Sequence, residues 1–352
     1  MDPPRRPVPA LMEEVVEDVL LRFPPDDPAR LLRAALVCKT WCRLVSGAGF
    51  RRRFRELHRT APMLGFLRTT ISVTRPSSYD TVFVPTSSFR PPRADSPSCR
   101  AIDALHGHIL LYSDIGLILW NPITGEERKL PRMPWEEFKL RTSAALLCAD
   151  HLNCGYGCRP SNVVVVGINP FEAFIYACVY SSEQDAWSKL VCARHQLIGD
   201  YFIIGHGTRV ANAVYFVCHL RTILQNNLGR KPRNMIIEYD LGRKKLSLVG
   251  LPSACKDSSI ALMTAEGGRL GFSMAQGSKL YMWSRRVDLV GEARWSQERF
   301  IELDRLHSDL TGPTNVLATS DGVGIVFIHT LEGIFTVDLM SGRVRKLCDA
   351  CD

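Results

Sequence analysis

The sequence lacks the features that would place the chain in a membrane or in a secretory compartment. No apolar run approaches the roughly 18 residues that a membrane-spanning helix needs. The N-terminal stretch MDPPRRPVPA has no apolar core of a signal peptide, and residues 1–8 are expected to form a disordered leader. No Asn-x-Ser/Thr glycosylation site occurs either. We therefore expect a protein of the cytoplasm, the nucleus or both, without a membrane partner.

Signatures of the common enzyme classes are missing as well. There is no phosphate-binding loop, no His-Glu-x-x-His motif and no dinucleotide fingerprint. Residues 271–275, GFSMA, come nearest to a nucleophile elbow, but they lack the final glycine of that motif. The 9 histidines are dispersed, without an evident carboxylate partner. These absences predict a protein that performs no catalysis of its own and needs no cofactor.

The cysteines do not form a recognisable disulfide framework, although the chain has 12 of them. Several stand inside apolar runs, such as Cys178 in IYACVYS and Cys218 in VYFVCH, where a free thiol behaves as a small apolar group. One cluster allows two interpretations, a cysteine-rich loop or a zinc site; it comprises Cys148, His151, Cys154 and Cys158. Because its spacing matches no common zinc finger, we expect the loop and no metal. Cys348 and Cys351 are expected to lie in a frayed tail.

Basic charge is concentrated near the N-terminus. The formal net charge is +8, and residues 1–60 contribute half of it, with 12 Lys/Arg against 8 Asp/Glu. The arginines of residues 51–55 could contact nucleic acid or an acidic partner, or form the solvated face of a linker helix. No zinc-finger spacing or aromatic platform surrounds them, so we expect the solvated helix and no nucleic-acid partner.

Residues 11–58 carry the helical signals of the chain. Apolar residues recur at helical spacing over residues 11–23, and acidic residues fill the other face. A proline pair beginning at Pro24 ends this helix. Asp27 is a suitable N-cap for a second helix over residues 28–36, because proline follows it at the first helical position.

A third helix is expected over residues 37–45, followed by a basic helical segment over residues 50–58. A module of this size buries only about 60% of its unfolded surface. Its apolar residues extend over more than one side of each helix, so something outside the module must cover part of them. Either the remainder of the chain or a partner protein would do so.

Several short motifs stand in a fixed order within this module. They are Leu11-Met12, Val19-Leu20, Arg22-Phe23-Pro24, Val37-Cys38-Lys39-Thr40-Trp41 and Leu44-Val45-Ser46. Over residues 9–58 they resemble the F-box, the adaptor-binding module of SCF-type ubiquitin ligases. One residue departs from the family pattern, because Met12 stands where an F-box usually has a proline that commonly contacts the adaptor.

The resemblance implies docking to a Skp-type adaptor and, through it, to a cullin. It assigns adaptor contacts to nine residues: Leu11, Met12, Val16, Leu20, Pro24, Leu32, Val37, Cys38 and Trp41. The sequence leaves open which of these residues face the adaptor and which form the core of the module itself.

The composition changes after residue 58. Residues 59–97 are expected to form a linker with a possible first strand near Met63. The Pro/Ser-rich passage over residues 76–97 is expected to be a long loop or a partly ordered linker. From residue 98 to residue 352 the β signals take over.

An internal repeat runs through residues 98–352, in which a strand leads through a turn into a second strand that closes on an apolar residue. Aromatic or apolar residues recur at intervals of roughly 45 to 60 residues, the length of a four-stranded propeller blade. They are Trp120, Tyr180, Tyr239, Trp283 and Val337. The alternative is a sandwich of unrelated hairpins. We expect an α+β multidomain chain, in which a small N-terminal all-α module precedes an all-β propeller of about five or six blades, the extra blade coming from the Met63 region or from ring closure.

The repeat also resembles the F-box-associated and kelch-like propellers of plant F-box proteins. Residues 120–125, WNPITG, and residues 337–342, VDLMSG, carry this resemblance. It implies that residues 98–352 form a substrate-binding domain. Residues 219–234 are longer than a hairpin needs, which favours either a contact loop or a tolerated insertion. The candidate substrate contacts there are Arg221, Arg230, Lys231 and Arg233.

Together the two resemblances imply a non-catalytic substrate-recognition subunit of an SCF-type ubiquitin ligase. Its partners would be a Skp-type adaptor, a cullin held through that adaptor, and an unknown target protein. Two alternatives stay open. One is a scaffold or decoy propeller protein with a degenerate F-box, which Met12 favours; the other is a propeller that binds a carbohydrate or a small molecule.

Overall fold

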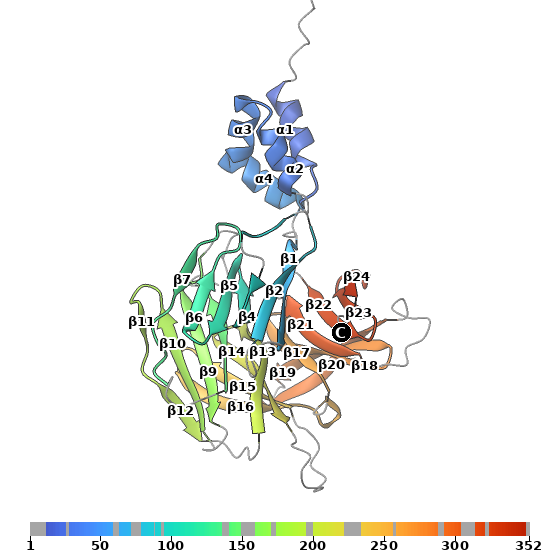
Figure 1. Ribbon diagram of the computed structural model, residues 1–352. Helices are drawn as coiled ribbons and strands as arrows, with labels where there is room; N and C mark the ends of the chain where they lie inside the picture. The colour runs from blue at the N-terminus through green and yellow to red at the C-terminus, as the bar shows by residue number, and fades with distance from the viewer. Residues whose placement is uncertain are drawn as a thin grey trace, which may run out of the picture. The chain divides into compact units, whose positions relative to one another are not determined.

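Over the residues that it describes, a computed structural model shows four α-helices followed by 24 β-strands (Figure 1). It describes residues 12–25, 28–58, 63–71, 79–87, 89–92, 95–135, 141–148, 159–169, 174–194, 200–221, 234–255, 258–287, 292–303, 314–320 and 324–349. The chain divides into two compact units. One comprises Met1–Thr69 with Thr81–Ser96, and the other comprises Thr70–Asp80 with Pro97–Asp352.

The helices are α1 (Glu13–Leu21), α2 (Pro28–Ala35), α3 (Lys39–Ser46) and α4 (Ala48–His58). The expected second helix is therefore confirmed to within one residue. The third begins two residues later than expected, because the amide of Val37 still bonds to the carbonyl of Ala34 and completes the end of α2. Asp27, the expected N-cap, lies outside the described residues.

The helical module has a small apolar core. Val16, Leu20 and Leu21 of α1 pack with Ala34 of α2 and Phe50 of α4, and Leu20 is fully buried. Side chains such as Trp41 and Phe54 cover this core only in part, together with Phe23, Leu31, Leu44 and Val45. Polar links join α1 to α4, through an ion pair between Arg53 and Glu17 and a 2.7 Å hydrogen bond between His58 Nε2 and the Leu21 carbonyl.

Six antiparallel sheets follow, and they are the blades of a six-bladed β-propeller. Blade 1 contains β1 (Gly65–Ile71), β2 (Tyr79–Pro85) and β3 (Asp95–Ser96). Blade 2 contains β4 (Cys99–Leu105), β5 (His108–Ser113), β6 (Gly116–Trp120) and β7 (Glu127–Lys129). Blade 3 contains β8 (Arg141–Leu147), β9 (Asn162–Asn169), β10 (Phe174–Ser181), β11 (Ala186–Trp187) and β12 (Val191–Arg194). Blade 4 contains β13 (Asp200–Val210), β14 (Ala213–Arg221), β15 (Asn234–Asp240) and β16 (Lys245–Gly250). Blade 5 contains β17 (Ile260–Ala265), β18 (Arg269–Gln276), β19 (Lys279–Val287) and β20 (Ala293–Glu302). Blade 6 contains β21 (Asn315–Ser320), β22 (Ile325–Thr330), β23 (Gly333–Asp338) and β24 (Val344–Asp349).

The recurrent aromatic and apolar residues hold equivalent places, since each lies on the third strand of its blade. Trp120 is on β6, Tyr180 on β10, Tyr239 on β15, Trp283 on β19 and Val337 on β23. The expected repeat is thus confirmed, and the alternative of unrelated hairpins is wrong. The additional blade includes β1, which follows Met63, as expected.

Apolar layers fill the space between successive blades from blade 2 to blade 6. One layer contains Trp135 and joins blades 2 and 3, and the next contains Phe216 and joins blades 3 and 4. A third layer, around Phe272, joins blades 4 and 5, and a fourth, around Val326, joins blades 5 and 6. Burying an aromatic or aliphatic side chain of this kind contributes about 1.5–3 kcal/mol. These layers make blades 2 to 6 one continuous packed body.

Hydrogen bonds also tie the first strands of neighbouring blades together. Arg100 of β4 donates to the Thr142 carbonyl at 2.5 Å, and Ser143 of β8 donates to the Gly205 carbonyl at 2.8 Å. Further bonds of this kind run from Thr264 to the Arg209 carbonyl at 3.5 Å and from Thr319 to the Leu262 carbonyl. Each bond crosses from one blade to the next, so it restrains the angle between them.

The first strand of blade 4 requires a glycine at its centre. β13 departs from regular pairing with β14 at a bulge between Ile204 and Thr208. A Cβ atom on Gly207 would lie 2.6 Å from the ring of Phe216 and 2.7 Å from the Cβ of Ala145. Both neighbours belong to packed strands, so only glycine lets β13 approach them this closely.

Three expectations from the sequence need correction. Cys348 was expected in a frayed tail, but it lies on β24 and pairs with Ile334 of β23. The Pro/Ser-rich passage is not a loop or linker throughout, because β2 and β3 lie within it. β2 alternates in burial, with Thr81 and Phe83 inward, which is the period of a half-buried strand. The sequence indicated no disulfide framework, yet Cys148 is disulfide-bonded. Eight other cysteines among the described residues form no disulfide. None of the described helices is long and apolar enough to cross a membrane.

Candidate functional site

The helical module separates the nine expected adaptor contacts by their burial. Val16 and Leu20 lie in the core of the module, with exposed fractions of 6% and 0%. Pro24 and Trp41 are partly buried, and Leu11 lies outside the described residues. Val16 and Leu20 therefore shape the module and present almost no surface to a partner in this conformation.

The other four expected contacts are exposed. Met12 precedes α1, Leu32 lies on α2, and Val37 and Cys38 form the connection between α2 and α3. The exposed fractions of the first three are 69%, 64% and 67%. Large apolar side chains this exposed are unusual on a small module unless another surface covers them.

Three further exposed apolar residues belong to the same module and were not among the expected contacts. Val15 and Val19 extend Met12 into a stripe along α1, at spacings of three and four residues. Leu36 follows α2 and is the most exposed apolar residue of the module, at 83%. Their positions in the helical pattern were visible in the sequence. What the sequence could not supply was the side of each helix that the core occupies.

Backbone hydrogen bonds hold the exposed residues between α2 and α3 in place. The Leu36 amide donates to the Leu32 carbonyl at 3.1 Å, and the Val37 amide donates to the Ala34 carbonyl at 3.1 Å. Beyond them, the Cys42 amide donates to the Cys38 carbonyl at 3.0 Å and opens α3. The connection is therefore a tight, bonded turn, which favours a preorganised surface. We use the name apolar surface for six exposed residues on two parts of the module: Met12, Val15 and Val19 along α1, and Leu32, Leu36 and Val37 along α2 and the turn after it.

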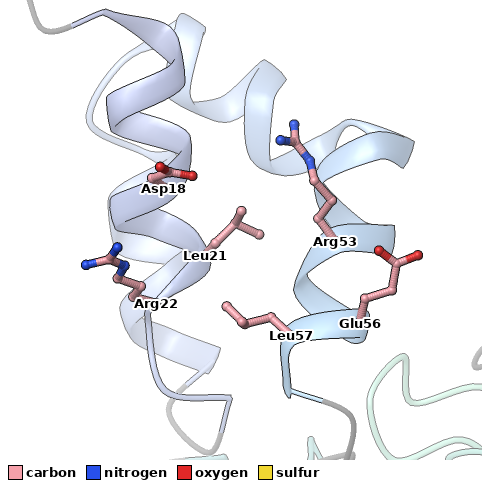
Figure 2. A pocket seen from close by; sticks show the side chains of 6 residues that line it. All are labelled: Asp18, Leu21, Arg22, Arg53, Glu56 and Leu57. Carbon is pink, nitrogen blue, oxygen red and sulfur yellow. The ribbon is translucent and has the colours of Figure 1, made fainter.

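A groove between α1 and α4 lies on a different side of α1. Figure 2 shows the side chains that line it, and Leu21 and Leu57 point toward one another across it. Its lining comprises Asp18, Leu21, Arg22, Arg53, Glu56 and Leu57. Leu57 is 57% exposed, and charged side chains of both signs surround it. Leu57 is therefore an exposed leucine outside the apolar surface, and a charge introduced there serves as a control for charges introduced in that surface.

The propeller residues suggested by the sequence can be placed only in part. Arg221 ends β14, whereas Arg230, Lys231 and Arg233 lie outside the described residues. Two side chains at the ends of β14 and β15 are joined by a hydrogen bond, in which His219 Nδ1 lies 2.5 Å from Asn234 Oδ1. The side-chain Nδ2 of Asn234 donates to the Ser258 carbonyl at 2.6 Å. This network joins β14 and β15 to the segment that follows blade 4.

The elbow-like segment and the cysteine cluster offer no assembled site among the described residues. Ser273, at the centre of GFSMA, is fully buried within β18, and Met282 is its partner on β19. In the described part of the chain, no group of three or more His, Cys, Asp or Glu side chains could hold a metal ion. His151, Cys154 and Cys158 lie outside that part.

Comparison with known proteins gives one family match. Residues 11–53 match the family model of the F-box domain. This match implies binding of a Skp-type adaptor, and the chain is an F-box domain followed by a six-bladed propeller. No curated protein matches the chain.

Several solved structures are similar to the chain at low identity. A luciferin-regenerating enzyme is 10% identical over 71% of this chain and 76% of that one, with a TM-score of 0.42. An ulvan lyase is 10% identical over 78% of this chain and 73% of its own, with a TM-score of 0.45. The propeller domain of the Trilobed protease from Pyrococcus furiosus is 11% identical over 81% and 92%, with a TM-score of 0.40. Similarity at this level carries none of their activities to this chain.

Proposed function

We propose that this chain is the substrate-recognition subunit of an SCF-type E3 ubiquitin ligase. The F-box would dock on a Skp-type adaptor and, through it, on a cullin, while the propeller would hold a target protein. The chain would perform no chemistry itself. It would bring lysines of the target within reach of the conjugating enzyme, which is catalysis by proximity.

The observation that carries the proposal is the apolar surface within residues 12–37. It presents six large exposed apolar side chains on a module whose described residues include six buried apolar ones. Transfer of such a side chain from water to an apolar contact is worth about 1.5–3 kcal/mol when it is fully buried. An adaptor that covers this surface would remove the cost of its exposure.

The propeller supports the second half of the proposal through its rigidity. The packed layers and the bonds between first strands restrain blades 2 to 6 against each other. A rigid scaffold with variable loops is a common basis for protein recognition. Two finer points belong to this proposal. The segment that begins at Arg221 would be a contact loop for the target protein, and the propeller would be of the plant-type, kelch-like kind.

Co-purification with a Skp-type adaptor tests the docking half. Leu32→Asp with Val37→Asp places two charges in the apolar surface without touching the buried core. We expect the wild type to co-purify with the adaptor and this double variant to lose it. Each single variant, Leu32→Asp and Val37→Asp, should also weaken co-purification, and Leu57→Asp is their control, since it places one charge on a similarly exposed leucine of α4. Equal loss in the control would contradict the assignment of the surface.

One observation favours the scaffold alternative, namely the methionine at position 12. Met12 is exposed at the start of α1, where it offers an apolar side chain but lacks the rigidity of proline. If the wild type fails to bind every Skp-type adaptor while the propeller stays folded, the scaffold function replaces the ligase function. Met12→Pro would then be the variant that restores binding.

A further inference from the structure

The turn between the third and fourth strands has the same construction in blades 2, 4 and 6. In each blade, a side-chain oxygen at the end of the third strand accepts the backbone amides two and three residues later, at 2.8 to 3.2 Å. The acceptors are Asn121, Asp240 and Asp338. Because these blades repeat one strand order, the three turns lie on the same face of the propeller. Each turn is held by its own bonds, so the turns differ chiefly in the side chains that they present.

The blade 4 turn presents three consecutive cations. Arg243, Lys244 and Lys245 are all exposed. The equivalent three residues read TGE in blade 2, at residues 124–126, and SGR in blade 6, at residues 341–343. Blade 4 therefore gathers three positive charges at a place where blade 2 has one negative charge and blade 6 has one positive charge.

The carboxylates next to this turn are engaged by neutral donors. Asp240 Oδ1 accepts two amides of its own turn, and the two oxygens of Glu238 accept the hydroxyls of Tyr215 and Ser247, each at 2.9 Å. Within the described part of the chain, no ion pair involves any of the three cations. Their charge is therefore available to a partner.

Cations close to the corresponding turns of blades 2 and 3 are paired. Arg128 Nη2 lies 2.9 Å from Asp185 Oδ1, and Arg159 Nη2 lies 3.6 Å from Glu126 Oε2. Each pair joins blade 2 to blade 3, so its charges are neutralised within the chain. This contrast separates the blade 4 turn from the turns of blades 2 and 3.

The backbone of Lys244 provides a second observation. Its φ is +51°, in the left-handed region that a residue with a Cβ atom rarely occupies. Glycine holds the same place in the other two turns, where Gly125 has a φ of +77° and Gly342 a φ of +66°. Lysine at this position costs stability relative to glycine. Because residues in such conformations cluster at functional sites, the strain favours a role for the Lys244 side chain.

The surroundings favour an acidic protein segment over a nucleic acid as the partner. Proteins that bind single-stranded nucleic acid add aromatic side chains on which bases stack. The tyrosines of the strands that lead to this turn are buried, with exposed fractions of 8% for Tyr215 and 1% for Tyr239. Clustered cations without an aromatic platform suit the carboxylates of Asp and Glu side chains.

We propose that residues 243–245 of the blade 4 turn are a docking site for an acidic segment of the target protein. This inference rests on the proposed function and names the class of target that the propeller holds. The cations would attract the segment over a distance and orient it on this face, with an attraction that salt weakens.

Fluorescence anisotropy with the full-length chain, without adaptor, tests the site. The probe is a labelled peptide of alternating glutamate and serine, and the reference peptide has glutamine in place of glutamate. At an ionic strength of about 0.15 M we expect the glutamate peptide to bind and the glutamine peptide to stay free. Absence of binding by the glutamate peptide, or equal binding of the two peptides, would overturn the proposal.

Lys245→Glu and Arg343→Glu are a matched pair of variants. Both residues are exposed cations at the same place in their turns, so both variants change the net charge equally. Lys245→Glu should bind the glutamate peptide about threefold more weakly or worse, and Arg343→Glu should bind it as the wild type does. Equal weakening in both variants would show that net charge, and not this turn, attracts the peptide.

Lys244→Gly separates a binding role from a structural one. It removes one charge and relieves the backbone strain, so we expect weaker binding of the glutamate peptide together with a higher melting temperature. Unchanged peptide binding in this variant would overturn the role of Lys244.

Two further measurements keep the alternatives apart. A labelled single-stranded oligonucleotide of the same charge should bind more weakly than the glutamate peptide, and tighter binding would overturn the choice of partner. Adaptor co-purification tests the proposed function separately. A chain that binds the peptide but no adaptor keeps this site and loses the ligase function, whereas a chain that binds the adaptor but not the peptide loses this site alone.

Discussion

The indole nitrogen of Trp187 donates a hydrogen bond to the carbonyl oxygen of Pro131, 2.9 Å away, and so joins blade 3 to the end of blade 2. Trp295 makes the same link two blades later, since its indole nitrogen lies 2.7 Å from the Gly250 carbonyl at the end of blade 4. Both tryptophans lie on outer strands. These two bonds fasten the rim of the propeller, as the bonds between first strands fasten its centre.

Loss of the indole donor at either link should loosen the rim. Trp295→Phe removes the bond to Gly250 and keeps an aromatic ring. Loss of the bond should lower the free energy of unfolding by about 0.5–1.5 kcal/mol, and the smaller contact area of the phenylalanine ring should lower it further. Urea unfolding of the full-length chain measures it. Trp283→Phe is the control, because its indole nitrogen is buried without a hydrogen-bond partner. An equal loss in both variants would show that ring packing, and not the bond, holds the rim.

Substitutions in the F-box should separate its core from its surface. Leu20→Ala empties a fully buried position, so we expect a loss of about 2–5 kcal/mol, comparable to the whole stability of so small a module. Leu32→Ala trims an exposed side chain and should change stability by no more than about 0.5 kcal/mol. Hydrogen exchange of the α1 and α4 amides reports both effects. If the α1 and α4 amides of Leu20→Ala exchanged as slowly as those of the wild type, Leu20 would not hold the core position that the structure gives it.

Thiol reactivity should follow burial. Burial raises the pKa of Cys178 to about 12 and that of Cys255 to about 11, and it raises the pKa of Cys218 as well. Only the thiolate reacts readily, so alkylation at pH 8 should modify Cys192 long before any of these three. Peptide mass mapping over time provides the measurement. Early modification of Cys218 in the folded chain would contradict the packed layer between blades 3 and 4.

The outer hairpin of blade 5 should depend on pH. Arg286 binds both carboxylate oxygens of Glu298, at 2.9 Å and 2.5 Å, and together with the Ser284 hydroxyl it lowers the pKa of Glu298 to about 2. A glutamate in an unfolded chain has a pKa of about 4.3. The pair therefore contributes stability that is fully present above that pH and is lost as the pH falls from about 4.3 toward about 2.

Glu298→Gln should remove this dependence. Its urea unfolding free energy should fall less between pH 5 and pH 3 than that of the wild type. Because both side chains are partly exposed, the difference should be small and should shrink in high salt. Arg286→Gln removes the other partner of the pair and should reduce the slope in the same way. If the unfolding free energy of Glu298→Gln fell with pH as steeply as that of the wild type, the ion pair between Arg286 and Glu298 would not be the source of the pH dependence.

The sequence predicted those parts of the fold that repeat or that follow local rules. The proline at position 28 marked the start of α2, and residues such as Tyr239 marked the third strand of each blade. β2 was missed because the Pro/Ser-rich residues around it hide its alternation, and its inward side chains, such as Phe83, become visible only in the sheet.

The candidate surface was predictable in location but not in detail. The F-box motif includes Leu20 and Val37 alike, yet one is fully buried and the other is exposed. Leu20 is buried because its side of α1 packs into the core of the module, whereas Val37 lies in the connection between α2 and α3, outside that core. These are tertiary relationships that no local pattern contains. The same holds for Trp187 and Trp295, whose partners lie on other blades.

Adaptor affinity is the measurement that tests the central claim most directly. A purified Skp-type adaptor is titrated calorimetrically into the full-length chain and into Val37→Asp and Leu57→Asp. The account predicts one-to-one binding, at least tenfold weaker for Val37→Asp and unchanged for Leu57→Asp. Absence of binding by the wild type, or an equal loss in both variants, would contradict it.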